Sequence, residues 1–104
     1  MSRNTESRMS LHDLLKSKRN EILSIAARHG ARNVRLFGSV ARGDADEYSD
    51  VDFLMQLGDE MSLMDHAALL VDLENLIGRK VDVAPEDSLR PKFRDRILRE
   101  AIPI

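Results

Sequence analysis

The spacing of hydrophobic residues divides the chain into alternating helical and extended segments. A capping pattern of the form [ST]-x-x-[DE] begins at Ser10, and a helical stripe of leucine, isoleucine and alanine continues from there toward Gly30. A second capping pattern begins at Ser62, and its stripe ends at Gly78. A last amphipathic segment starts at about Arg90. We therefore predict three helices of ordinary length.

Short apolar or alternating runs lie between these helices and predict strands. Residues 34–37 (VRLF) form an apolar run, whereas 50–57 (DVDFLMQL) and 80–84 (KVDVA) alternate between apolar and polar positions. A short helix over residues 40–42, capped by Ser39 and ended by Gly43, follows the first strand. The resulting order α-β-α-β-α-β-α predicts an α/β (α+β) protein with a small mixed β-sheet and helices packed mainly on its apolar face.

Composition narrows the class of protein. The 104 residues suit one domain, which we place at 10–104 behind a flexible polar tail at 1–9. The formal net charge of −2 argues against direct nucleic-acid binding, and the lack of cysteine excludes disulfides and zinc–thiolate sites. The sequence contains neither an apolar run of membrane-spanning length nor a signal peptide, so we expect a cytoplasmic protein without a membrane partner.

Three aspartates occupy polar positions of the alternating runs. Asp50 and Asp52 are two residues apart, so on a strand their side chains leave the same face and repel unless a cation lies between them. Such hard oxygen ligands suit Mg²⁺ or Mn²⁺. Asp82 interrupts the valines of the next strand, and it joins the pair if the two strands are neighbours. Three carboxylates on one face could hold two cations and activate an attacking hydroxyl.

The Gly38-Ser39 pair lies at the end of the first predicted strand. Glycine there allows the backbone to approach a phosphate closely, Ser39 adds a hydroxyl donor, and Arg42 follows one turn later. Taken singly, an Asp-x-Asp sequence is more often a polar strand edge, and a Gly-Ser pair is more often a turn. Their conjunction with a third carboxylate predicts a loop that holds nucleotide phosphates and cations that bridge them to the aspartates.

The stretch from Gly38 to Asp52 fits neither of two other ion- or phosphate-binding motifs. An EF-hand loop requires a ligand where Tyr48 stands and glycine where Ser49 stands. A Walker P-loop requires the sequence G-x-x-x-x-G-K-[ST], which the chain does not contain.

The stretch GSVARGDADEYSDVD resembles the motif of the DNA polymerase β-like nucleotidyltransferases, which is Gly-Ser, ten residues, then Asp-x-Asp. The chain length and the segment LRPKFRDRILREAI also resemble the minimal nucleotidyltransferase (MNT) group. The resemblance implies a polymerase β-like palm fold. It also implies roles for seven residues, with Asp50, Asp52 and Asp82 as catalytic metal ligands and Gly38, Ser39, Arg42 and Ser49 as nucleotide ligands.

The resemblance further implies an activity and a partner. Members of the MNT group are typically encoded beside a HEPN-domain ribonuclease toxin. The resemblance therefore implies that this chain is an antitoxin that uses Mg²⁺ to transfer AMP from ATP to a tyrosine hydroxyl of that toxin. Two alternatives stay open: an antitoxin that acts by binding and occlusion alone, and a transferase for small molecules of the aminoglycoside type. The latter is disfavoured because 104 residues leave no room for an acceptor domain. Apolar faces on both terminal helices leave a homo-oligomer possible.

Overall fold

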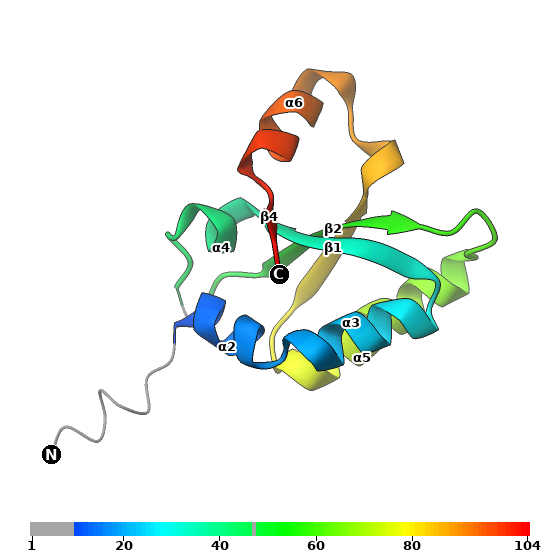
Figure 1. Cartoon of the computed structure of the whole chain (residues 1–104), viewed down its shortest axis with the longest axis horizontal. Helices are drawn as coiled ribbons and strands as arrows, with labels where there is room; N and C mark the ends of the chain where they lie inside the picture. The colour runs from blue at the N-terminus through cyan, green and yellow to red at the C-terminus, as the bar shows by residue number, and fades with distance from the viewer. Residues whose placement is uncertain (1–9, 47) are drawn as a thin grey trace, which may run out of the picture.

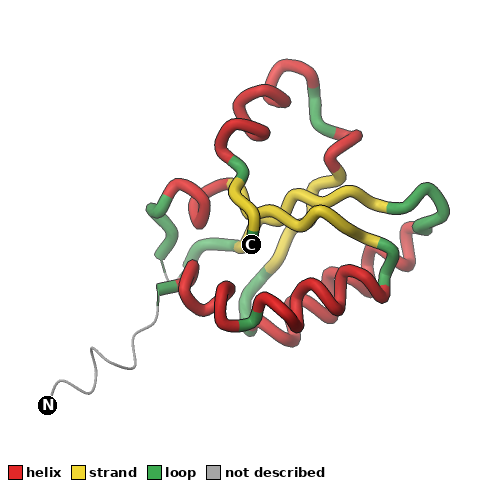
Figure 2. Tube along the Cα trace, in the orientation of Figure 1, coloured by secondary structure: helices red, strands yellow, loops and turns green. Residues whose placement is uncertain are grey.

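A computed structural model describes residues 10–46 and 48–104, so the expected tail at 1–9 lies outside the described residues. Within that part of the chain, four strands form one mixed sheet in the order β3-β2-β1-β4 (Figures 1 and 2). β1 is antiparallel to both β2 and β4, and β3 is parallel to β2. The strands span Ala31–Phe37 (β1), Val51–Leu57 (β2), Val81–Pro85 (β3) and Ile102–Pro103 (β4).

The helices lie on both sides of this sheet. In Figure 1, α2, α3 and α5 lie below the sheet, and α6 lies above it. Their bounds are Leu11–Ser17 (α2), Arg19–Arg28 (α3), Gly38–Arg42 (α4), Leu63–Ile77 (α5) and Pro91–Glu100 (α6), and a 3-10 turn covers Glu86–Ser88. The predicted α/β architecture, with a mixed sheet and most helices on one face, is confirmed.

The main core lies between the sheet and the lower helices. Val51, Phe53 and Met55 alternate along β2, are fully buried, and pack with side chains that include Leu69 and Leu73 of α5. This alternation places Asp52 on the opposite face, which faces α6. The core therefore fixes which face of β2 carries the carboxylate.

Two element boundaries differ from the prediction because of local backbone geometry. The first predicted helix is two helices, since Lys18 leaves helical geometry at φ −104° and ψ 13° and ends α2 where α3 begins. β1 starts at Ala31 rather than at residue 34. A bulge between Arg32 and Arg35, with Asn33 at φ 56°, shifts the register and hides the alternation that would have revealed the strand's first half.

Three further differences from the prediction, in α4, β2 and β4, are small. The predicted cap at Ser39 is wrong: α4 begins at Gly38, with Phe37 as its N-cap, so Ser39 lies inside the first turn. β2 begins at Val51, one residue later than predicted, and the two-residue β4 was not predicted. The helix start at Ser62 is confirmed as a complete capping box with Asp65.

Candidate active site

Three backbone segments meet at one end of the sheet. Phe37, the last residue of β1, pairs with Asp52 near the start of β2, and Asp52 pairs with Asp82 near the start of β3. Gly38 follows Phe37 directly, so the Gly-Ser turn lies beside Asp52, and Asp82 is one strand further away. The sequence analysis grouped Asp82 with Asp52 only if their strands were neighbours. The pairing of β2 with β3 confirms that they are.

Gly38 is in very close contact with Asp52. Its φ is +72°, and a Cβ added at this position would lie 2.4 Å from Asp52 Oδ2. Both the left-handed backbone and the lack of space therefore require glycine. The sequence predicts that glycine here lets the backbone approach a phosphate, which stays a prediction, and in the structure the group that a Cβ would meet is the carboxylate of Asp52.

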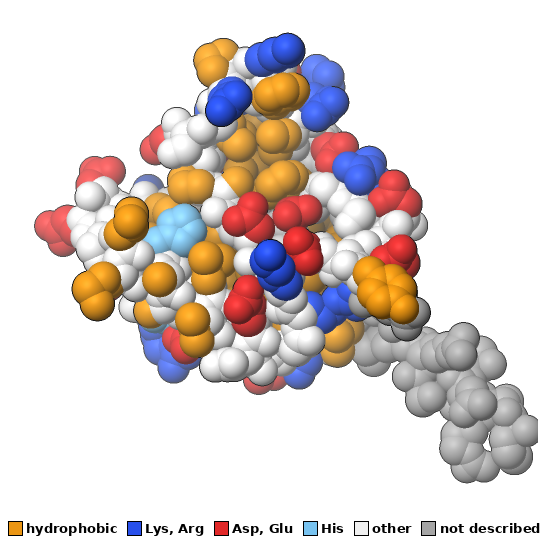
Figure 3. Space-filling model, turned by 180° about the vertical axis from the view of Figure 1, so that it is seen from behind, with side chains coloured by type: hydrophobic (Ala, Val, Ile, Leu, Met, Phe, Trp, Pro, Cys, Tyr) orange, Lys and Arg blue, Asp and Glu red, His pale blue; other side chains and the backbone are white. Residues whose placement is uncertain are grey.

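The charges at this end of the sheet influence one another. Burial raises the pKa of the half-buried Asp52 carboxyl, the negative charges of Asp82 and Asp50 raise it further, and Arg42 acts in the opposite direction. Asp50 and Asp82 are exposed. Seen from behind, acidic side chains gather near the middle of the molecule around a basic side chain, with apolar side chains above them (Figure 3). A cation would relieve the repulsion that Asp52 experiences.

The donor set fits a hard divalent cation in the type of its ligand atoms. Asp52 and Asp82 occupy paired positions on neighbouring strands, which lie about 4.8 Å apart, and both supply carboxylate oxygens. Across residues 10–46 and 48–104, no group of three or more His, Asp or Glu side chains is already arranged around a metal position. Binding therefore requires the aspartate side chains to turn toward a common point.

A fourth acidic residue, Glu100 at the end of α6, contacts the Gly-Ser turn. The backbone N–H of Gly38 donates to Glu100 Oε1 at 3.0 Å, and Arg42 Nη1 donates to the same oxygen at 3.3 Å. Sequence reasoning missed this residue, which is 62 positions from Gly38 and occupies an ordinary polar position of an amphipathic helix. A cavity of about 310 Å³ lies beside the contact, and Arg96 and Ile97 form part of its wall.

The two serines of the motif have different surroundings. Ser39 is partly exposed in the first turn of α4, and its carbonyl accepts a hydrogen bond from Asp44 N at 3.0 Å. Ser49 belongs to a tight turn, in which its hydroxyl accepts from Asp46 N at 2.9 Å and its carbonyl accepts from Arg79 at 2.8 Å. Ser49 thus orders the loop that leads to Asp50, and its role as a nucleotide ligand stays a prediction.

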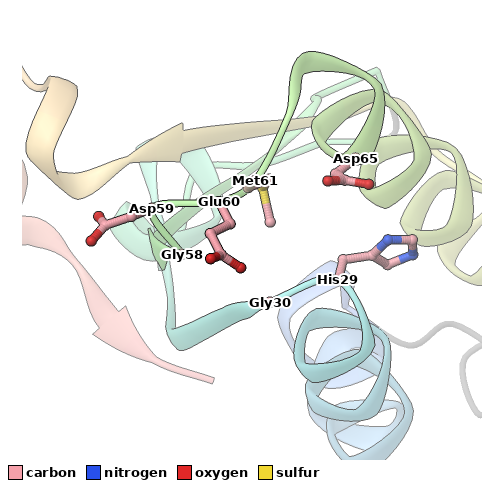
Figure 4. Close-up of a pocket in the computed structure, with 7 residues that line it drawn as sticks. All are labelled: His29, Gly30, Gly58, Asp59, Glu60, Met61 and Asp65. Atoms are coloured by element: carbon pink, nitrogen blue, oxygen red, sulfur yellow. The ribbon is translucent and has the colours of Figure 1, made fainter.

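A larger cavity, of about 560 Å³, lies at the other end of the sheet (Figure 4). His29, Gly58 and Asp65 are among its lining residues, and the nearby strand pair is Ala31 with Leu57. Its lining contains none of the residues that the sequence predicts for the site. We therefore place the candidate site at the Gly38–Asp52 end, where the glycine that no larger residue could replace and the mutually repelling carboxylates lie.

Comparison with known proteins identifies the family to which the chain belongs. The model of the nucleotidyltransferase domain family matches residues 19–104, and the chain belongs to that family.

In the part of the chain that the structure describes, no helix is long and apolar enough to span a membrane.

Individual relatives extend the comparison. A candidate protein adenylyltransferase of Methanocaldococcus jannaschii is 38% identical over 86 residues, which is 83% of this chain and 92% of that protein. The protein adenylyltransferase MntA of Thermococcus cleftensis is 39% identical over 75 residues, 72% of this chain and 76% of the relative. A solved structure of a candidate minimal nucleotidyltransferase, at 49% identity, superposes with a TM-score of 0.82 over 94% of this chain and 99% of its own.

A more distant structure shares the fold. It is a crystal structure of a toxin–antitoxin with AMP-PNP, with a TM-score of 0.69 at 19% identity over 81% of this chain and 69% of its own.

Proposed function

We propose that this nucleotidyltransferase is a protein adenylyltransferase and an antitoxin. In this proposal it transfers AMP from ATP to a tyrosine hydroxyl of a partner HEPN ribonuclease toxin and so inactivates it. The observation that carries the proposal is the register of Asp52 with Asp82, together with Gly38 pressed against Asp52. The names of the two archaeal relatives support the reaction, and the distant toxin–antitoxin structure supports the kind of partner.

The reaction is an in-line displacement at the α-phosphorus of ATP. The acceptor hydroxyl oxygen forms a bond to that phosphorus, the bond to the oxygen that bridges to the β-phosphate breaks, and pyrophosphate leaves. The hydroxyl proton passes to the carboxylate of Asp82. Asp82 suits this role because it is exposed and can return the proton to water, whereas Asp52 is half-buried.

The remaining residues position the nucleotide. Gly38 and Ser39 bring backbone and hydroxyl donors to the triphosphate, and Arg42 offsets part of its charge, which in phosphoryl-type transfers is much of the catalysis. Asp50 and Asp52, with Asp82, would hold Mg²⁺, as two ions, and Mn²⁺ has the same ligand preference. When bound, these cations neutralise charge on the triphosphate and on the acceptor oxygen.

The test is a transfer reaction with the complete chain, its HEPN partner, Mg²⁺ and each of the four nucleoside triphosphates in turn. Intact mass of the partner is measured, with Asp50→Asn/Asp52→Asn as the inactive variant and Asp95→Asn, an exposed position on α6, as a matched control. A partner that gains nucleoside monophosphate only when Asp50 and Asp52 are present supports the proposal and identifies the base. An unmodified partner that is nonetheless bound and inhibited would replace it with occlusion.

A further inference from the structure

Glu100 joins the end of α6 to the predicted nucleotide site. One of its oxygens accepts hydrogen bonds from the Gly38 backbone N–H, at 3.0 Å, and from Arg42 Nη1, at 3.3 Å. Its side chain is 23% exposed, so the contact is partly shielded from water, while that of Arg42 is 49% exposed. A single carboxylate oxygen therefore occupies two donors of the Gly-Ser turn.

These donors are the ones that the proposed function assigns to the triphosphate. A backbone amide carries one hydrogen, so the N–H of Gly38 cannot donate fully to a carboxylate and to a phosphate at the same time. The guanidinium of Arg42 is further engaged by Asp44 Oδ2 at 3.2 Å. A phosphate that binds to these donors would also lie close to the negative charge of Glu100, which repels it.

The surroundings of Glu100 allow it to leave. None of the residues of α6 is fully buried, and the helix is held by Arg94, which donates to the carbonyl of Glu86 at 3.1 Å. The cavity of about 310 Å³ beside Glu100 provides room for its side chain to rotate without opening the main core.

We infer that Glu100 is an internal competitor for the nucleotide site: it occupies the Gly38 N–H and Arg42 in the free protein, and a nucleoside triphosphate must displace it. This inference rests on the proposed function, because it takes the triphosphate as the ligand of those donors. Its consequence is that the last turn of α6 loses its contact with the Gly-Ser turn when nucleotide binds, while β4, which follows it, stays paired with β1.

The test measures the affinity of the complete chain for AMP-PNP with Mg²⁺ by titration calorimetry. Glu100→Gln removes the charge, and Glu100→Asp keeps the charge but shortens its reach. Each is expected to bind the nucleotide roughly three- to tenfold more tightly than the natural chain, the size of the net contribution of one ordinary hydrogen bond. Asp95→Asn removes the same charge from an exposed position of α6 and is expected to change the affinity by less than about twofold.

Hydrogen exchange of the Gly38 amide gives a second readout that does not depend on nucleotide. It is expected to be protected in the free natural chain and to exchange faster in both Glu100 variants. A variant that melts like the natural chain but binds AMP-PNP equally or more weakly would overturn the inference and make Glu100 a positioning residue. If none of the proteins binds AMP-PNP, the nucleotide part of the proposed function fails and the inference fails with it. If only the Glu100 variants bind, the inference is supported in its strongest form.

Discussion

The two ends of the sheet differ in whether the surroundings stabilise or destabilise a charged carboxylate. At the end with the larger cavity, the Ser62 side chain and backbone stabilise the Asp65 carboxylate and lower its pKa, and His29 pairs with Asp72 at 2.7 Å. At the other end the pKa of Asp52 is raised, and its glycine neighbour leaves no room for a Cβ. The candidate site is therefore chosen by its unfavourable electrostatics, which are typical of functional sites, and not by the size of its cavity.

The largest effect expected from this comparison is on catalysis by Asp52→Asn. Transfer should fall on the order of a thousandfold, because the variant loses a charge that the nucleotide and its cations require. Its stability should be equal or higher, because the raised pKa means that the ionised carboxyl disfavours the native state. That cost appears as pH rises from the ordinary carboxyl range through the raised pKa, and it is absent in acid.

Thermal melts of both proteins at several pH values, without divalent cations, check this sign. Asp52→Asn should gain relative to the natural chain as pH rises. A variant that loses stability at neutral pH would show that the carboxylate contributes to the fold, and the contrast between the two ends would fail.

Alanine substitutions at two glycines distinguish the effect of the contact with Asp52 from the general cost of a left-handed backbone. Gly38 and Gly78 have nearly equal φ, +72° and +78°, but a Cβ at Gly78 meets nothing within 4 Å. Alanine at either position should cost about 1–2 kcal/mol through the left-handed backbone. Gly38→Ala should also displace the Asp52 carboxylate and lower transfer on the order of a hundredfold.

The measurement for these two variants combines urea unfolding with the transfer assay. Similar losses of stability with unequal losses of activity are expected. Equal activity in both would mean that the contact between Gly38 and Asp52 has no part in catalysis.

The smallest effect concerns the far end of the sheet. Ser62→Ala removes the hydroxyl that accepts from Asp65 N at 3.1 Å, so it should cost about 1 kcal/mol of stability. Transfer at temperatures well below the melt should be unchanged, since the cap is remote from Asp52. A Ser62→Ala protein that stays folded but transfers poorly would show that the two ends are coupled.

The alternation of each strand predicted the face that carries each carboxylate, whereas their proximity depended on β2 and β3 being neighbours. Asp52 lies between buried Val51 and Phe53, and Asp82 lies between buried Val81 and Val83, so their faces could be predicted even though Leu54 interrupts the alternation further along β2. β1 was predicted only in part, because Asn33 shifts its register, and a bulge leaves no periodic signal. Glu100 could not be predicted, because its contact with Gly38 depends on how α6 returns over the sheet, and a glutamate on an amphipathic helix usually faces water.

The order of the strands gives Asp82 a second physical role. β3 lies at an edge of the sheet, where unpaired backbone groups can recruit a strand from another molecule. Exposed Lys80 and Asp82, with Pro85 at the strand's end, are the kinds of residue that prevent such pairing. The acid proposed to accept the proton therefore also places a charge on the open edge of the sheet, which disfavours pairing with a strand of another molecule.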